Sequence, residues 1–171
     1  MKHFYPLFIL LITLCACAQT KEPENNYPLQ VGDIYFDAKL DDPNFKLCYE
    51  AEVYQYYNFG KGLNYKGEKI KINEHFKTGF KPDDDINESG YLTIRFIVNC
   101  KGETGRFRVL GMDNDYKEKV FSESLTRQLL TLTKKLDGWI VGEFEGENVA
   151  YDYYQYLTFK IENGKLIEIM P

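Results

Sequence analysis

The chain has 171 residues, of which 44% are hydrophobic and 27% are charged, and its formal net charge is −5 at pH 7. This composition is typical of a globular protein, and the length fits one domain or one domain with a small companion. A negatively charged chain lacks the basic surface that binds phosphate backbones, so nucleic acid is excluded as an expected partner.

The amino terminus has the layout of a secretory signal peptide, with a basic start at Lys2, an apolar stretch at residues 4–14 and small residues around Cys17. That stretch is about a dozen residues long, whereas a membrane-spanning helix needs about 20, so no permanent span is expected. Leu14-Cys15-Ala16-Cys17 resembles the bacterial lipobox, which implies a signal peptide at residues 1–16 and lipid attachment at Cys17. An ordinary cleavable signal is the alternative, and Cys15 is a second acceptor that fits the motif less well.

Residues 17–28 are polar and rich in Glu, Asn and Pro, which is typical of a flexible tether. We therefore expect an exported protein that is lipid-anchored in the cell envelope, in the outer membrane and facing the periplasm or the cell surface. Cys48 and Cys100 would then lie in an oxidising compartment, so we expect a disulfide between them. Two separate buried thiols are the alternative.

Residues 29–88 carry the weakest patterns. Apolar residues alternate over Leu47–Val53, which predicts a strand, and Lys69–Phe76 could form a short helix. Lys81–Asp85 is an acidic linker. We expect a small β/α segment here and make no finer prediction of its structure.

The later half of the chain has clear periodicity. Leu92–Val98 alternates apolar and polar residues, turn residues follow, and Arg106–Met112 resumes the β pattern, which together predict an antiparallel hairpin. Asp113–Asp115 offer helix-capping side chains, and apolar residues then recur at spacings of three and four from Val120 to Leu136. That spacing predicts an amphipathic helix of about five turns.

Two strands are expected after this helix. Tyr151–Ile161 is rich in aromatic and β-branched residues, and the turn signal Asn163-Gly164 separates it from Lys165–Ile169. The expected fold class is α+β: an antiparallel β-sheet with one main amphipathic helix packed on a face, in ββαβ order with an additional C-terminal strand.

Residues 89–171 resemble the TonB C-terminal domain family, in the form found in exported proteins of Bacteroidetes-type bacteria. The resemblance rests on the order and spacing of several short motifs. They are the strand Gly90–Asn99 with Lys101-Gly102 in its turn, Phe107–Leu110, the leucine-rich helix, Gly138-Trp139, the Gly142–Gly146 loop, Val149 and the strand Tyr156–Ile161.

The resemblance implies a non-enzymatic protein-binding domain that uses strand addition at an exposed sheet edge. It also implies a protein partner in the envelope, with a TonB-dependent outer-membrane receptor as the candidate and a link to outer-membrane transport. The chain lacks an uncleaved inner-membrane helix and a long Pro-rich spacer, so coupling to a proton-driven motor is not expected. Partner identity, membrane leaflet and oligomeric state stay open.

The strand after the helix is expected to be the binding edge or a near-edge strand. The alternative is that the hairpin turn at Asn163-Gly164 folds Lys165–Ile169 over that edge and covers it. The predicted partner-binding residues are Tyr153, Tyr154, Gln155, Tyr156, Leu157, Thr158 and Phe159.

No catalytic residues, metal site or cofactor are predicted. His75 is the only histidine outside the signal peptide, which leaves no paired-histidine zinc site. Asp83–Glu88 lacks the glycine and the final glutamate of a calcium-binding EF-hand loop. Two other functions stay open: a structural or surface lipoprotein with no transport role, and a small hydrolase or ligand-binding enzyme, which would need a deep pocket.

Overall fold

The computed structural model describes residues 33–49, 52–55, 63–83 and 85–170. The expected signal peptide (1–16), the tether (17–28) and Cys17 lie outside these residues. From Asp33 onward the chain forms one compact unit, which is the part considered below. Within it, no helix is long and apolar enough to cross a membrane.

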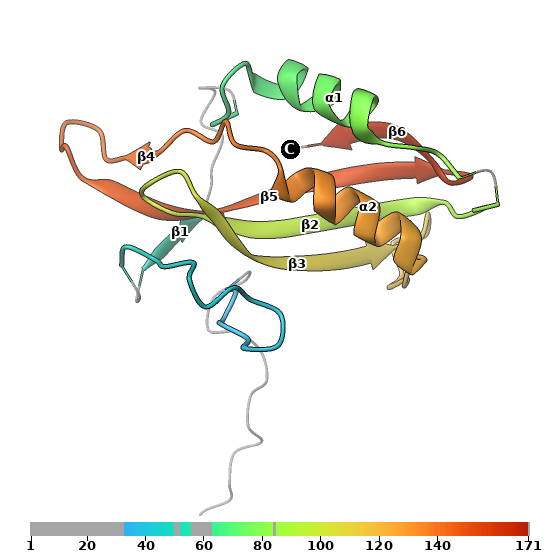
Figure 1. Ribbon diagram of the computed structural model, residues 1–171, viewed down its shortest axis with the longest axis horizontal. Coiled ribbons are helices and arrows are strands. Elements are labelled where there is room, and N and C mark those ends of the chain that lie inside the picture. Colours follow the sequence, from blue (N-terminus) through green and yellow to red (C-terminus); the bar gives the residue numbers. More distant parts are fainter. Residues whose placement is uncertain (1–32, 50–51, 56–62, 84, 171) are drawn as a thin grey trace, which may run out of the picture. The chain divides into compact units, whose positions relative to one another are not determined.

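The sheet is built around one long strand, β5 (Ala150–Glu162), shown in Figure 1. On one side β5 pairs antiparallel with β2 (Gly90–Val98) along the whole length of β2. The predicted hairpin then joins β2 to β3 (Thr104–Met112), with a register irregularity between Arg95 and Ile97. The strand order β1-β5-β2-β3 places β3 at one end of the sheet.

Three short strands pair with β5 as well. β6 (Lys165–Met170) returns antiparallel after a tight turn, in which Asn163 and Gly164 have φ of 50° and 72°. That left-handed geometry is why Asn-Gly suits the turn. β1 (Val53–Gln55) lies parallel to β5, and β4 (Gly142–Glu143) pairs with its first residues. The α+β prediction is confirmed, with the addition that the sheet is mixed.

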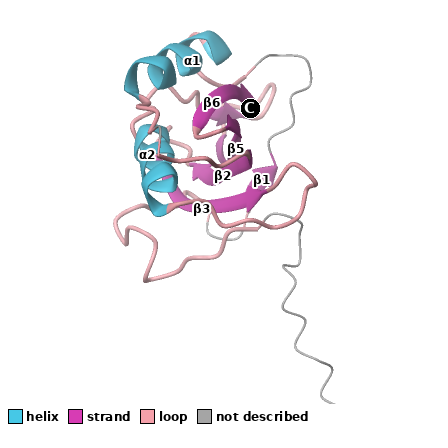
Figure 2. Cartoon of the chain, turned by 90° about the vertical axis from the view of Figure 1, so that its right-hand side faces the viewer, coloured by secondary structure: helices cyan, strands magenta, loops and turns pink. Residues whose placement is uncertain are grey.

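Two helices, α1 (Glu68–Gly79) and α2 (Glu123–Lys134), lie on the same side of the sheet, as Figures 1 and 2 show. Buried residues of both helices share one core with the alternate residues of β2 and β5 that face them. α1 supplies Ile72 and Phe76 to that core, so residues on both sides of the predicted boundary between residues 88 and 89 pack in it.

The second helix begins later than the capping pattern predicts. The Asp113 carboxylate accepts hydrogen bonds from the backbone N–H groups of Asp115 and Lys117 and so forms a turn in place of a helix start. The chain then runs back along β3, where Lys119 N–H donates to Gly111 O at 2.9 Å. A Cβ at Gly111 would lie 2.1 Å from Lys119 O, so this approach requires glycine.

A smaller core lies on the opposite face of the sheet. Ile97 of β2 and Tyr154 of β5 point there, and the segment before β1 covers them with Ile34 and Leu47. This arrangement brings residues 33–49 beside β3, which bears on the binding edge described next.

Candidate functional site

The strand predicted as the binding edge or near-edge strand pairs with other strands on both sides. All seven predicted partner-binding residues, Tyr153 to Phe159, pair with β2 on one side. On the other side Tyr153 and Tyr154 pair with β1, and Thr158 and Phe159 pair with β6. The segment is therefore not an edge at either end; it lies next to the edge, as the near-edge alternative predicts, and the hairpin alternative holds for Thr158 and Phe159.

Most side chains of that segment are also unavailable to a partner. Tyr153, Leu157 and Phe159 are buried in the helix-side core, and Tyr154 is buried in the opposite core. Gln155 is fully buried, and its Nε2 donates to Tyr156 O at 3.0 Å. Tyr156 is the exposed member, with 42% of its surface accessible.

One open edge of the sheet is β3, at the end opposite to β1. Among the described strands, β3 pairs only with β2. In a strand, the N–H and C=O of one residue point to the same edge, and those of the next residue point to the other edge. Since Gly111 O accepts from Lys119 on the side away from β2, Val109 must direct its N–H and C=O to that side too. Within the described part of the chain, no backbone group bonds Val109 there.

Two adjoining hollows, of about 920 and 890 Å³, lie along this edge and share Val109 and Leu110 in their walls. One face of α2 overhangs the edge on the helix side. The loop at residues 33–40 flanks it on the opposite face. The α2 side chains that line the hollows are Glu123, Thr126, Leu130 and Lys134.

Large apolar side chains are exposed around the same edge. Val120 is 90% exposed and Leu110 is 52% exposed, and both line the first hollow. The other exposed apolar residues that line the hollows are Tyr35, Phe36, Leu40 and Tyr116. Contiguous exposed apolar surface is typical of protein-binding sites.

An ion pair holds the flanking loop against β3. The Arg108 guanidinium donates to both carboxylate oxygens of Asp41 at 2.7 Å and to Tyr35 O at 2.6 Å. These bonds lower the pKa of Asp41, which is almost fully buried, and raise the pKa of Arg108. The hydrogen bond between the two side chains is the largest contribution to both shifts. We call the two hollows along β3 the β3 groove. The loop that forms one of its walls is therefore held in place by a bidentate ion pair.

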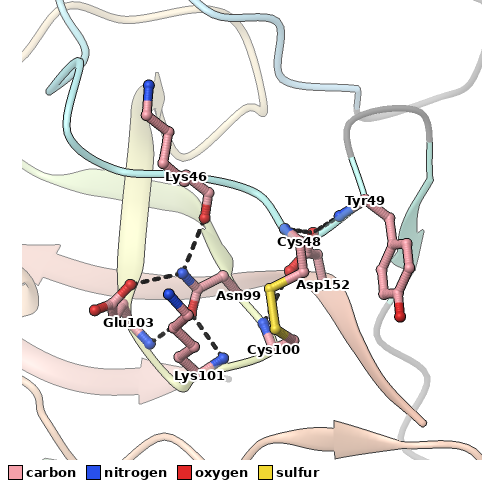
Figure 3. Close-up of a disulfide and its surroundings, with 8 residues drawn as sticks. All are labelled: Lys46, Cys48, Tyr49, Asn99, Cys100, Lys101, Glu103 and Asp152. Carbon is pink, nitrogen blue, oxygen red and sulfur yellow. Dashed lines mark hydrogen bonds between the residues drawn. A yellow bond between two sulfur atoms is a disulfide. The ribbon is translucent and has the colours of Figure 1, made fainter.

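A disulfide and a buried carboxylate anchor the far end of the same segment (Figure 3). Cys48 and Cys100 are joined, as the sequence predicts, across 52 positions of the chain. Asp152, which is fully buried, accepts backbone N–H groups from Cys48, Tyr49 and Cys100 at 2.7, 3.0 and 2.8 Å. Three such donors satisfy a buried carboxylate without a cation.

Asn99 completes this anchor from the β2–β3 turn. Its Oδ1 accepts the backbone N–H groups of Lys101 and Glu103, and its Nδ2 donates to Lys46 O and to the Glu103 carboxylate. Asp152 and Asn99 thus tie the segment at residues 46–49 to β5 and to the hairpin turn. We call Cys48, Cys100, Asp152 and Asn99 the anchor cluster.

The anchor cluster also contains a group of possible metal ligands. The sulfurs of Cys48 and Cys100 and a carboxylate oxygen of Asp152 lie within 4.8 Å of one another. The two sulfurs are bonded to each other, however, and Asp152 already accepts three N–H donors. In the oxidised protein these atoms form a structural contact, because zinc binds thiolates and not disulfides.

Two other candidates from the sequence have structural roles. The Nε2 of His75 lies 3.0 Å from Leu132 O and donates to it, which links α1 to the end of α2. Asp83 forms a turn, since its Oδ1 accepts the N–H of Asp85 and its C=O accepts the N–H of Ile86. Neither side chain stands beside the hollows along β3.

Sequence reasoning missed Asp41, Arg108, Asn99 and Asp152. Only Asp152 carries a local signal, because a single carboxylate interrupts the aromatic run of its strand.

The comparisons with family models, with curated proteins and with solved structures found no match to the chain. The resemblance to the TonB C-terminal domain family thus rests on the sequence pattern alone.

Proposed function

We propose that this chain is a non-enzymatic, lipid-anchored envelope protein whose folded part binds an extended segment of a protein partner along β3. The observation that carries the proposal is the outward N–H and C=O of Val109 between two hollows with exposed apolar walls. Strand addition uses such main-chain groups for affinity and the flanking hollows for side-chain selection. The sequence resemblance makes a TonB-dependent outer-membrane receptor the candidate partner.

The bonds already made along β3 limit where a partner strand could add. Lys117–Lys119 already bond to the Gly111–Asp113 end of β3, so an added strand would continue from there beside Phe107–Val109. Its side chains would enter the hollow lined by Leu130 of α2 and the hollow lined by Val120. Phe107 O accepts from the Arg108 guanidinium, so fewer than the usual main-chain bonds are available at that end.

Two observations favour this function over the other two considered. A structural lipoprotein with no partner would gain from a covered edge, because an open edge invites unwanted pairing. The most plausible catalytic groups, His75 and Asp152, are committed to hydrogen bonds that hold the fold together. Both points support a binding role for the β3 edge.

The test is site-specific photo-crosslinking in intact cell envelopes. A photoreactive phenylalanine analogue replaces Leu110 or Val120 in the groove, or the exposed apolar residues Ile140 and Val149 outside it as controls. We expect a crosslinked protein at the two groove positions only, and mass spectrometry of the adduct to show an extended segment of an outer-membrane receptor.

A second variant tests the main-chain mode. Val109→Pro removes an outward N–H and no bond to β2, so it should abolish the adduct while the free energy of unfolding changes little. Equal adducts at all four positions, or an adduct that persists in Val109→Pro, would contradict strand addition at β3. Adducts confined to Tyr156 in a further probe would place binding on β5 instead.

A further inference from the structure

A second groove lies between α1 and β6, on the far side of β5 from β3, where Figures 1 and 2 both show these two elements side by side. It has a volume of about 720 Å³, within the range of about 300–1,000 Å³ that is usual for small-molecule sites. One face of α1 forms one wall and β6 forms the other. The residues that matter below are Lys69, Lys77, Phe80, Lys165, Ile167 and Glu168.

The groove is basic although the protein is acidic. Lys69, Lys77 and Lys165 line it, and among the described residues Glu168 is the single acidic one in its wall. Glu168 is matched by Lys69, whose Nζ lies 3.7 Å from it. In the part of the chain that the structure describes, Lys77 and Lys165 have no side-chain partner, so two ammonium groups at the groove are left for a ligand.

The interior of the groove is apolar. Phe76, Phe80 and Ile169 form its base, and the half-buried Leu166 and the exposed Ile167 add accessible hydrocarbon along β6. Lysines around a hydrocarbon surface match a molecule that carries an anionic group on an alkyl chain.

The groove is poorly suited to strand addition, unlike the edge at β3. β6 has only six residues, whereas β3 has nine. A short edge strand offers few N–H and C=O groups to an added strand. An extended acidic peptide therefore fits this groove less well than an amphiphile does.

We infer that the α1–β6 groove binds a long-chain fatty-acid anion, with the carboxylate at Lys77 and Lys165 and the alkyl chain along Leu166, Ile167 and Phe80. Phospholipids share the same chemistry through their phosphate and acyl chains. The inference is independent of the function proposed for β3, since the two grooves have no residue in common.

The experiment uses the full chain in cell envelopes and a fatty acid that carries a photoreactive diazirine and an alkyne. After illumination the labelled peptides are mapped by mass spectrometry. We expect label in the segments that contain Lys69–Pro82 and Lys165–Ile169, and a loss of about tenfold in Lys77→Gln/Lys165→Gln, since exposed charge contacts contribute a few-fold each. The matched control, Lys101→Gln/Lys135→Gln, removes two exposed lysines outside the groove and should label as the wild type does.

Three further probes distinguish a free fatty acid from the other ligands that could occupy the groove. A diazirine fatty alcohol lacks the charge and should label these segments at least about fivefold less. Diazirine phosphatidylglycerol that labels the groove better than the fatty acid would overturn the assignment to a free fatty acid. Label outside the two segments, label insensitive to the lysine pair, or labelling only by a photoreactive acidic peptide would overturn the groove as an amphiphile site.

Discussion

The contribution of the disulfide to the free energy of unfolding can be calculated from the positions of its two cysteines in the chain. Cys48 lies before β1 and Cys100 lies in the β2–β3 turn, with 52 positions between them. The perturbation is Cys48→Ser/Cys100→Ser. It removes the crosslink and keeps the three N–H donors of Asp152 and the side-chain bonds of Asn99, so the native structure around the anchor cluster should persist.

The magnitude follows from the entropy of the unfolded chain. A crosslink that closes a loop of about 50 residues restricts the unfolded state by about 4 kcal/mol at 25 °C. In a domain of this size that loss should lower the melting temperature by about 10–15 °C. Because the unfolded chain also becomes less compact, the denaturant dependence of the unfolding free energy should become steeper.

The assay is equilibrium unfolding in urea, followed by the fluorescence of Trp139. This residue is 4% exposed and packs against Phe96 and Tyr65, so its emission should change when the helix-side core opens. Wild-type protein under reducing conditions should lose as much stability as the double variant. A loss below about 1 kcal/mol would refute the reasoning, because it would mean that the hydrogen bonds of the anchor cluster already restrict the chain to the same extent.

Four further predictions concern single side chains. Because the pKa of Asp41 is lowered by Arg108, its stabilisation is complete above about pH 4 and is lost as the pH falls through the folded pKa; Asp41→Asn should therefore flatten the acid limb of unfolding free energy against pH. Asp152→Asn should cost about 2–4 kcal/mol in urea unfolding, since three buried N–H donors then face one acceptor oxygen in place of two. Phe76→Ala should cost about 3–5 kcal/mol, because this fully buried ring contacts Phe159 in the helix-side core. Cys17→Ala should move the protein from the membrane fraction to the soluble fraction on envelope fractionation; an unchanged distribution would rule out lipid attachment there.

The sequence by itself determined the elements whose signals are local. Leu92–Val98 alternates because one face of β2 meets the helices, and Asn163-Gly164 adopts the left-handed turn that joins β5 to β6. The amphipathic spacing after Val120 located α2, and the presence of just two cysteines after the lipobox-like motif indicated the disulfide. In each case the residues that give the signal are the same residues that form the element.

The start of α2 shows where local signals compete. Asp113 is a good helix-capping residue, and its carboxylate does accept backbone N–H groups. It uses them to form a turn, because the chain gains a bridge back to β3 at Gly111 and Lys119. Two conformations were therefore compatible with the same capping pattern, and contact with a neighbouring strand selected between them.

Only the tertiary structure decided which strands lie at an edge of the sheet. Edge status depends on what lies beside a strand: β5 is covered at Asp152–Tyr154 by β1, which comes about a hundred residues earlier, whereas β3 is left open at Val109. The groove walls depend in the same way on Asp41 meeting Arg108, 67 positions apart, and on Asp152 meeting Cys48, 104 positions apart. Such pairs leave no periodicity in the sequence, because the free energy that joins them is gained only when the two distant segments are brought together.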